Sequence, residues 1–238
     1  MRTAARWAGV LLLPIALNAQ PVAKPALSIG RVDTVWSAVL KEKRPVLIYT
    51  PMSYPDTTYT PRTYPVLCTT VDHNGVPTKG YGGGGGMAHF LRFIESELIP
   101  HIDSAYRSAP YRLLIGHSLG GIASINALYT MPETFNAYVA IDPSLWWDKR
   151  LLLNQAKAFF SQPRPAGRAL YVALANTLGS DDSLPNGHYA SIVQLNRILE
   201  TYNTSGIRYG FKYYPDDSHG SVPLIAEYDA LRKLIGGR

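Results

Sequence analysis

Residues 112–130 read RLLIGHSLGGIASINALYT, and this stretch decides the fold that the sequence predicts. Arg112 to Ile115 is a short apolar run typical of a strand, and Ile122 to Tyr129 predicts a helix. Between them, residues 116–120 form the pattern G-x-S-x-G with Ser118 at its centre. A G-x-S-x-G sequence at a strand-to-helix turn is typical of a serine nucleophile held on a sharp, strained bend.

The glycines around Ser118 have a physical role in such a bend. Strand and helix approach each other closely there, and Gly116, Gly120 and Gly121 leave the space that a side chain would fill. The turn exposes the serine hydroxyl above the sheet. It also places the backbone N–H of Leu119 at a helix N-terminus, where it can stabilise an oxyanion.

A serine hydroxyl needs a general base to become a nucleophile. Where a G-x-S-x-G turn carries the nucleophile, an acid and then a histidine follow it along the chain. Of the six histidines, only His188 and His219 follow Ser118. We favour His219, because it lies just after the last predicted strand, where open α/β sheets build their sites. His188 precedes a helix and stays as the alternative.

The acid that would orient this histidine has several candidates. The loop after the penultimate predicted strand is the usual place, and it contains Asp181 and Asp182, our first choice. Asp142, which follows the preceding strand, is the second candidate. Asp217 is too close to His219 in sequence to reach its ring easily. A Ser–His dyad without an acid is a further possibility.

Strands and helices alternate along the rest of the chain. This order predicts a mostly parallel sheet with helices on both faces, and we expect one α/β domain over residues 26–238. Pro100 is expected to kink or end its helix. The predicted strands are residues 44–49, 64–68, 112–115, 137–141, 168–174 and 208–214, and the predicted helices are residues 88–106, 122–129, 190–202 and 223–235.

The N-terminus has the layout of a secretory signal peptide. Arg2 and Arg6 precede a short apolar run, and small residues follow near Ala19. We expect cleavage of residues 1–19 and a secreted or periplasmic protein. The run is too short for a membrane span of about 20 residues. An uncleaved membrane anchor is the alternative.

Composition narrows the classes of protein further. Of the 238 residues, 46% are hydrophobic and 17% are charged, which excludes a disordered chain. The net charge of +6 is spread without a dense basic run, and this disfavours a nucleic-acid partner. Cys68 is the single cysteine, so neither a disulfide within the chain nor a cysteine-based zinc site can form. No metal-binding or Walker motif is present, and we expect no cofactor.

Three segments together carry a family resemblance: GHSLGG at 116–121, PSLWWD at 143–148 and HGSVPL at 219–224. They resemble the putative-esterase family of α/β-hydrolases, and most of all its siderophore-esterase-like branch. The resemblance covers about residues 28–236. It implies an α/β-hydrolase fold, with Ser118 as nucleophile and His219 as base. It also implies that Trp146 and Trp147 lie near an acyl or aromatic pocket, although both could equally be packing residues.

The sequence departs from the family pattern after Cys68. The family normally has a further strand–helix unit before the glycine-rich segment, and here that unit is missing. The strands at 44–49 and 64–68 must then close the gap or leave unpaired edges. The second oxyanion N–H normally comes from the missing loop, and the five glycines at 82–86 are either a replacement or a linker.

These observations predict a secreted serine esterase that acts on a small-molecule ester through an acyl-enzyme. Two alternatives use the same residues. One is a degenerate hydrolase that serves as a ligand-binding module, with Trp146 and Trp147 holding the ligand. The other is an acyltransferase that passes the acyl group to an alcohol.

Overall fold

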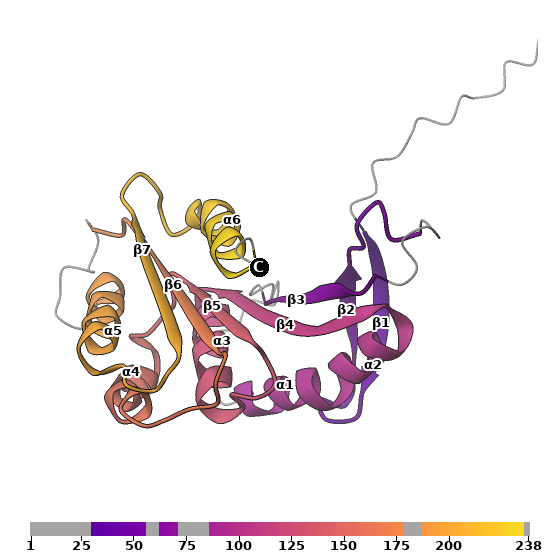
Figure 1. Ribbon diagram of the computed structural model, residues 1–238, viewed down its shortest axis with the longest axis horizontal. Helices are drawn as coiled ribbons and strands as arrows, with labels where there is room; N and C mark the ends of the chain where they lie inside the picture. The colour runs from indigo at the N-terminus through magenta and orange to yellow at the C-terminus, as the bar shows by residue number, and fades with distance from the viewer. Residues whose placement is uncertain (1–29, 56–61, 71–85, 179–186, 236–238) are drawn as a thin grey trace, which may run out of the picture.

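A computed structural model describes residues 30–55, 62–70, 86–178 and 187–235. Its main sheet is entirely parallel, with the strand order β3-β4-β5-β6-β7, so consecutive strands are neighbours (Figure 1). Every residue of β5 and β6 is buried, as expected of strands that are covered on both sides. The strands are β3 (Tyr64–Thr70), β4 (Ser108–His117), β5 (Ala137–Ile141), β6 (Ala169–Ala175) and β7 (Arg208–Tyr214).

Helices cover both faces of this sheet and form two hydrophobic clusters. One cluster joins alternate strand residues such as Leu114 to α1, η2, α3, α4 and α5, and the other joins residues such as Leu113 to α6. This arrangement is the predicted doubly covered α/β sheet. The helices are α1 (Met87–Phe93), η2 (Ile94–Leu98), α2 (Ile99–Ala105), α3 (Leu119–Thr130), α4 (Trp147–Phe160), α5 (His188–Tyr202) and α6 (Val222–Leu234).

Several elements differ from the sequence prediction. The helical segment from Met87 continues through Pro100 to Ala105, and the π-helical turn η2 directly precedes α2, which has proline in its first turn. The change from π-helical to α-helical hydrogen bonding leaves a backbone N–H at this point without an α-helical acceptor. Proline has no N–H, so it is accommodated here without the loss of such a hydrogen bond. Strand β1 (Arg31–Ser37) and helix α4 were not predicted. In the described part of the chain, no helix combines the length and the apolar character needed to cross a membrane.

The N-terminal strands form a separate hairpin. β1 pairs antiparallel with β2 (Glu42–Ile48), and within the described ranges neither strand pairs with the main sheet. The gap expected between residues 44–49 and 64–68 is therefore not closed. Glu97 of η2 holds the hairpin, because its carboxylate accepts hydrogen bonds from the Ser37 hydroxyl (2.5 Å) and the Ala38 N–H (2.9 Å).

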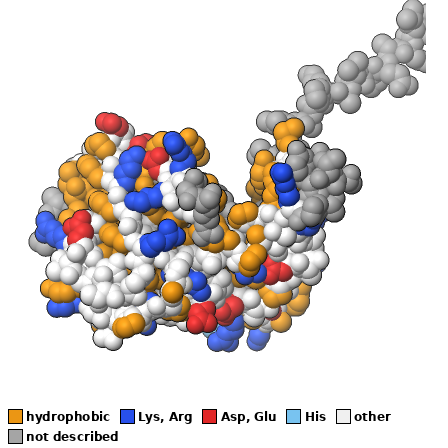
Figure 2. Space-filling view, viewed as in Figure 1, with side chains coloured by type: hydrophobic (Ala, Val, Ile, Leu, Met, Phe, Trp, Pro, Cys, Tyr) orange, Lys and Arg blue, Asp and Glu red, His pale blue; other side chains and the backbone are white. Residues whose placement is uncertain are grey.

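The outer face of this hairpin leaves hydrophobic side chains in solvent. Trp36 is 62% exposed, and Val32 and Leu47, which are paired across the two strands, are 69% and 64% exposed. Figure 2 shows hydrophobic side chains on the surface of the lobe that contains the hairpin. On the opposite side of β1, Val35 is buried in the hydrophobic cluster, so the hairpin packs one face against the core.

Backbone segments approach each other very closely at the turn between β4 and α3. A Cβ atom added to Gly116 would lie 1.9 Å from the carbonyl oxygen of Gly120, and one added to Gly121 would lie 2.9 Å from Cα of Pro143. Pro143 lies two residues after the end of β5, so the nucleophile turn packs closely against the end of the neighbouring strand. Gly116 and Gly121 are required here for space, as the sequence pattern predicted.

We predict that Gly116→Ala destabilises the protein by about 3 kcal/mol or more, because its new Cβ meets backbone that cannot rotate away. Gly121→Ala should have a smaller effect in the same direction. Gly86→Ala is the matched control, since a Cβ there meets nothing within 4 Å. Urea unfolding of the three variants measures this order, and an unchanged midpoint for Gly116→Ala would contradict the close crossing.

Candidate active site

Ser118 lies at the bend between β4 and α3 and has a strained backbone. Its φ of 57° and ψ of −117° fall outside the regions that residues other than glycine prefer. Hydrogen bonds hold this conformation: the Ser118 N–H donates to the carbonyl of Ile141 (3.0 Å), and its own carbonyl accepts from Gly121 (3.0 Å) and Ser144 (3.1 Å). The end of β5 therefore fixes the position of the Ser118 side chain.

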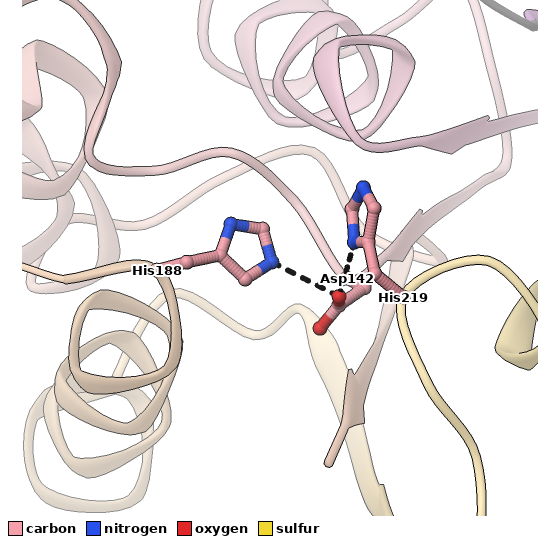
Figure 3. A group of neighbouring side chains, drawn as sticks. All are labelled: Asp142, His188 and His219. Atoms are coloured by element: carbon pink, nitrogen blue, oxygen red, sulfur yellow. Dashed lines mark hydrogen bonds and ion pairs between the residues drawn. The ribbon is translucent and has the colours of Figure 1, made fainter. Parts of the chain in front are cut away.

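His219 reaches this side chain from the loop that follows β7. Its Nε2 lies 3.1 Å from the Ser118 hydroxyl oxygen, within hydrogen-bond distance. Its Nδ1 lies 2.5 Å from Oδ2 of Asp142. One imidazole therefore joins a serine and a carboxylate that come from neighbouring strand ends, and Figure 3 shows its contact with the carboxylate.

Asp142 directly follows β5 and is completely buried. Its φ of 42° is left-handed, a conformation that aspartate tolerates better than most residues. Its Oδ1 accepts a hydrogen bond from the Ala175 N–H (2.9 Å) at the end of β6. Burial opposes ionisation, yet the contacts with His188, His219 and Ala175 outweigh it and hold the pKa of Asp142 below its usual range.

The carboxylate that contacts His219 follows β5, one strand earlier than the first-choice position. Asp181 and Asp182 lie outside the described residues, and the carboxylate that contacts His219 is Asp142, the second candidate. The order along the chain is still serine, acid, histidine. Sequence alone ranked Asp142 lower because the reach of its side chain depends on the left-handed backbone at that residue.

His188, the alternative base, also contacts this carboxylate. Its Nε2 lies 3.0 Å from the same Oδ2 of Asp142, and Figure 3 shows the two imidazoles on either side of the carboxylate. On its other side, Nδ1 of His188 accepts a hydrogen bond from the indole N–H of Trp146 (3.1 Å). Both ring nitrogens are therefore engaged away from Ser118, so the geometry favours His219 as the base.

Asp142, His188 and His219 also have the spacing of a metal site, since one ligand atom from each lies within 4.8 Å of the others. The hydrogen bond at Trp146 argues against ligation by His188. An indole nitrogen only donates, so Nδ1 of a neutral His188 is unprotonated and Nε2 carries the proton. A protonated Nε2 has no lone pair for a metal, and it suits donation to the carboxylate instead.

Two further polar side chains lie beside the nucleophile, and the sequence analysis assigned neither a role. The hydroxyl of Ser144 is buried, and its oxygen is 3.2 Å from that of Ser118. If Ser118 donates its proton to His219, then Ser144 must be the donor in this second contact. The His117 ring lies 4.4 Å from the His219 ring, and burial followed by the proximity of His219 lowers the pKa of His117. His117 therefore favours its neutral form.

The remaining predicted site residues have mixed positions. Leu119 is the first residue of α3, so its N–H has no acceptor within the helix and is available beside Ser118. Trp146 is 40% exposed, and its ring contacts that of Trp147 edge to face at 5.7 Å. Most of the five glycines, Gly82 to Gly85, lie outside the described residues. A groove of about 380 Å³ on α5 has Tyr189 and Arg197 in its lining, but neither Ser118 nor His219.

A strained serine between strand and helix, a histidine after the last strand and a buried aspartate define the class. The chain has the α/β-hydrolase fold with a Ser–His–Asp arrangement of side chains. The family model described as "Putative esterase" matches residues 71–219, more than half of the chain. The chain belongs to that family.

Curated relatives and solved structures agree with this assignment. The chain is 33% identical over 153 residues to the siderophore enterobactin esterase of Emericella nidulans, with 56% of this chain and 47% of that protein covered. It is 31% identical over 153 residues to the ferri-bacillibactin esterase BesA of Bacillus subtilis, with 62% and 51% covered. The chain therefore matches only about half the length of these two relatives.

An IroE-like serine hydrolase from Shewanella oneidensis has a similar structure. The TM-score is 0.71 at 26% identity, over 87% of this chain and 80% of that one. The siderophore hydrolase EstB of Aspergillus nidulans has a TM-score of 0.69 at 20% identity, over 89% and 96% of the two chains, which supports the fold. These matches confirm the expected resemblance to the siderophore-esterase-like branch.

We predict that Asp142→Asn lowers the free energy of unfolding by about 1–3 kcal/mol at pH 7, because a buried charge-assisted contact is lost. The pKa of Asp142 is lower in the folded than in the unfolded protein, so its stabilisation is present above the ordinary value of 3.8. The difference from wild type should therefore shrink as pH falls below about 4.

Urea unfolding between pH 3 and pH 7 measures this difference. Exposed Asp148, which also has positive φ, provides the matched control Asp148→Asn, and its effect should be small at every pH. A wild-type advantage over Asp142→Asn that stays constant down to pH 3 would contradict the ionised, histidine-bound carboxylate.

Proposed function

We propose that this chain is an exported serine esterase that forms an acyl-enzyme on Ser118. The observation that carries the proposal is the continuous chain of contacts from the Ser118 hydroxyl through His219 to Asp142. These contacts connect a nucleophile, a base and a buried negative charge in the order that acyl transfer from an ester requires. Export is proposed from residues 1–19, which lie outside the described part of the chain.

The proposed reaction follows from where each proton can go. The Ser118 oxygen attacks the ester carbonyl while Nε2 of His219 takes the hydroxyl proton, and Asp142 stabilises the resulting imidazolium through Nδ1. The carbonyl oxygen becomes an oxyanion, for which the Leu119 N–H is a donor at the helix N-terminus. His219 then gives its proton to the departing alcohol oxygen, and the acyl group stays on Ser118.

Water completes the cycle by the same path. His219 removes a proton from a water molecule, the hydroxide attacks the acyl carbonyl, and the proton returns to the Ser118 oxygen as the acid leaves. The hydroxyl of Ser144 lies 3.2 Å from the Ser118 oxygen and can donate a hydrogen bond to it whenever the oxygen bears negative charge. No step requires a cofactor.

For the substrate, we propose an ester-linked siderophore. The names of the two curated relatives support this class, since one is a siderophore enterobactin esterase and the other a ferri-bacillibactin esterase. Loss of Arg2 and Arg6 with residues 1–19 leaves 21 basic against 17 acidic residues, a net charge of +4. A positive protein attracts anionic ligands, and ferric catecholate complexes are anionic. Trp146, which contacts His188, and Trp147, which packs against Trp146, are available to stack on a catechol ring.

A fluorophosphonate probe tests the nucleophile directly. We expect covalent labelling at Ser118 that disappears in Ser118→Ala and slows strongly in His219→Ala, because the hydroxyl then lacks its base. His101→Ala is the matched control, since His101 also pairs with an aspartate but lies on α2. Failure of folded wild-type protein to react would overturn the esterase and favour a ligand-binding module.

Hydrolysis assays test the substrate class. We expect release of catechol acids from a ferric tricatecholate triester, with a higher kcat/KM than for p-nitrophenyl esters of graded acyl length. Addition of an alcohol acceptor separates hydrolysis from acyl transfer: an esterase gives mainly free acid, and an acyltransferase gives the new ester. Labelling of Ser118 without cleavage of the siderophore would leave the serine hydrolase in place and reject this substrate.

A further inference from the structure

A second histidine shares the carboxylate that supports His219. Nε2 of His188 and Nδ1 of His219 both approach Oδ2 of Asp142, at 3.0 and 2.5 Å. The two rings are nearly perpendicular, with centroids 5.0 Å apart. His188 is buried at the N-terminus of α5, while the His219 side chain is 41% exposed at the reaction centre. The two imidazoles therefore occupy different environments although they share one oxygen atom.

The protonation of His188 follows from its other neighbour. The indole N–H of Trp146 can only donate, and it points to Nδ1 of His188 at 3.1 Å. Nδ1 must therefore present its lone pair, and the single ring proton of a neutral imidazole is on Nε2. This nitrogen lies 3.0 Å from Oδ2 of Asp142, so the protonated side of the ring is the one next to the carboxylate. A cationic His188 would carry a proton on Nδ1 as well and would lose the Trp146 hydrogen bond.

The carboxylate of Asp142 is thereby held from three directions. The Ala175 N–H holds Oδ1, and His188 and His219 meet at Oδ2. Rotation of the Asp142 carboxylate about its Cβ–Cγ bond would break the contact between Oδ2 and His219. The Ala175 N–H holds only Oδ1, so it does not by itself give Oδ2 a buried partner. His188 supplies that second anchor from α5, an element that carries none of the reacting groups.

We propose that His188 is a positioning residue for the esterase reaction: locked as its Nε2–H tautomer by Trp146, it fixes the Asp142 carboxylate in the orientation that supports His219. This inference rests on the proposed function and adds Trp146 as a residue that acts through His188. Trp146 therefore has an energetic role in the site besides any contact of its ring with substrate. His188 orients the carboxylate of Asp142, and Trp146 in turn orients the ring of His188.

Kinetics of two variants at position 188 test the proposal. His188→Met introduces an apolar side chain of similar length that offers no N–H, and we expect kcat to fall about 10–100-fold with KM nearly unchanged. His188→Gln offers an amide N–H to Asp142 and an amide oxygen to Trp146, so it should recover most of kcat. His101→Met is the control and should match wild type.

Thermal unfolding of each variant separates positioning from folding. Wild-type kcat in His188→Met overturns the proposal, and so does a glutamine variant as slow as the methionine variant while both remain folded. A rise in KM in the His188 variants without any loss of kcat would assign His188 to substrate binding, and that result would also overturn the proposal.

Nuclear magnetic resonance of the imidazole nitrogens gives a readout that needs no turnover. We expect His188 to show an unprotonated Nδ1 and a protonated Nε2, and Trp146→Phe to release that preference by removing only the indole N–H. Trp36→Phe, on the exposed hairpin face, is the control. The His219 Nδ1 proton should exchange faster with solvent in His188→Met than in wild type.

A protonated Nδ1 on His188 in wild type, or an unchanged exchange rate in His188→Met, overturns the proposal. Because these spectra do not depend on catalysis, they separate its failure from failure of the esterase. A chain that does not react with fluorophosphonate but shows the expected tautomer would retain the His188 arrangement and lose only the proposed reaction.

Discussion

A single buried negative charge organises this end of the molecule. The Asp142 carboxylate has no exposed surface, and a charge so placed is tolerated only where donors surround it. Each donor comes from a different element: Ala175 ends β6, His188 begins α5 and His219 follows β7. Since Asp142 itself directly follows β5, three strand ends and one helix must keep their relative positions for the charge to be stable.

The same constraint reaches the nucleophile through the backbone. Ser118 donates its N–H to Ile141, the residue before Asp142, and accepts from Ser144 on the other side of Pro143. The nucleophile turn and the acid turn are therefore one hydrogen-bonded unit, compressed where Gly121 meets Pro143. Packing in this region leaves little freedom for either side chain, as preorganised catalysis requires.

Sequence predicted most of this architecture, for reasons that can be traced to particular residues. The strand β5 and the strand β7 were predicted with the observed bounds, because each is a short β-rich run closed by a turn. Ser118 and His219 were found from a local pattern and from chain order. The contact between Asp142 and His219 could not be predicted from the sequence, because it depends on the positive φ at Asp142 and on the distance between neighbouring strand ends. The α4 helix was missed, and three consecutive residues at its start, Asp148 to Arg150, have left-handed φ values. The shared contact of His188 left no trace in the sequence.

The position of the acid after β5 has a consequence for how this enzyme class can diversify. Where the acid follows the penultimate strand, the connection that carries it must keep a length and shape compatible with the histidine. Here none of the groups in the proposed proton relay lies between Ala175 and His188, so the relay does not fix the length of that connection. Its two ends are held by the contacts of Ala175 and His188 with Asp142. Changes of length between these two anchors can therefore be accommodated without displacing either contact with the carboxylate.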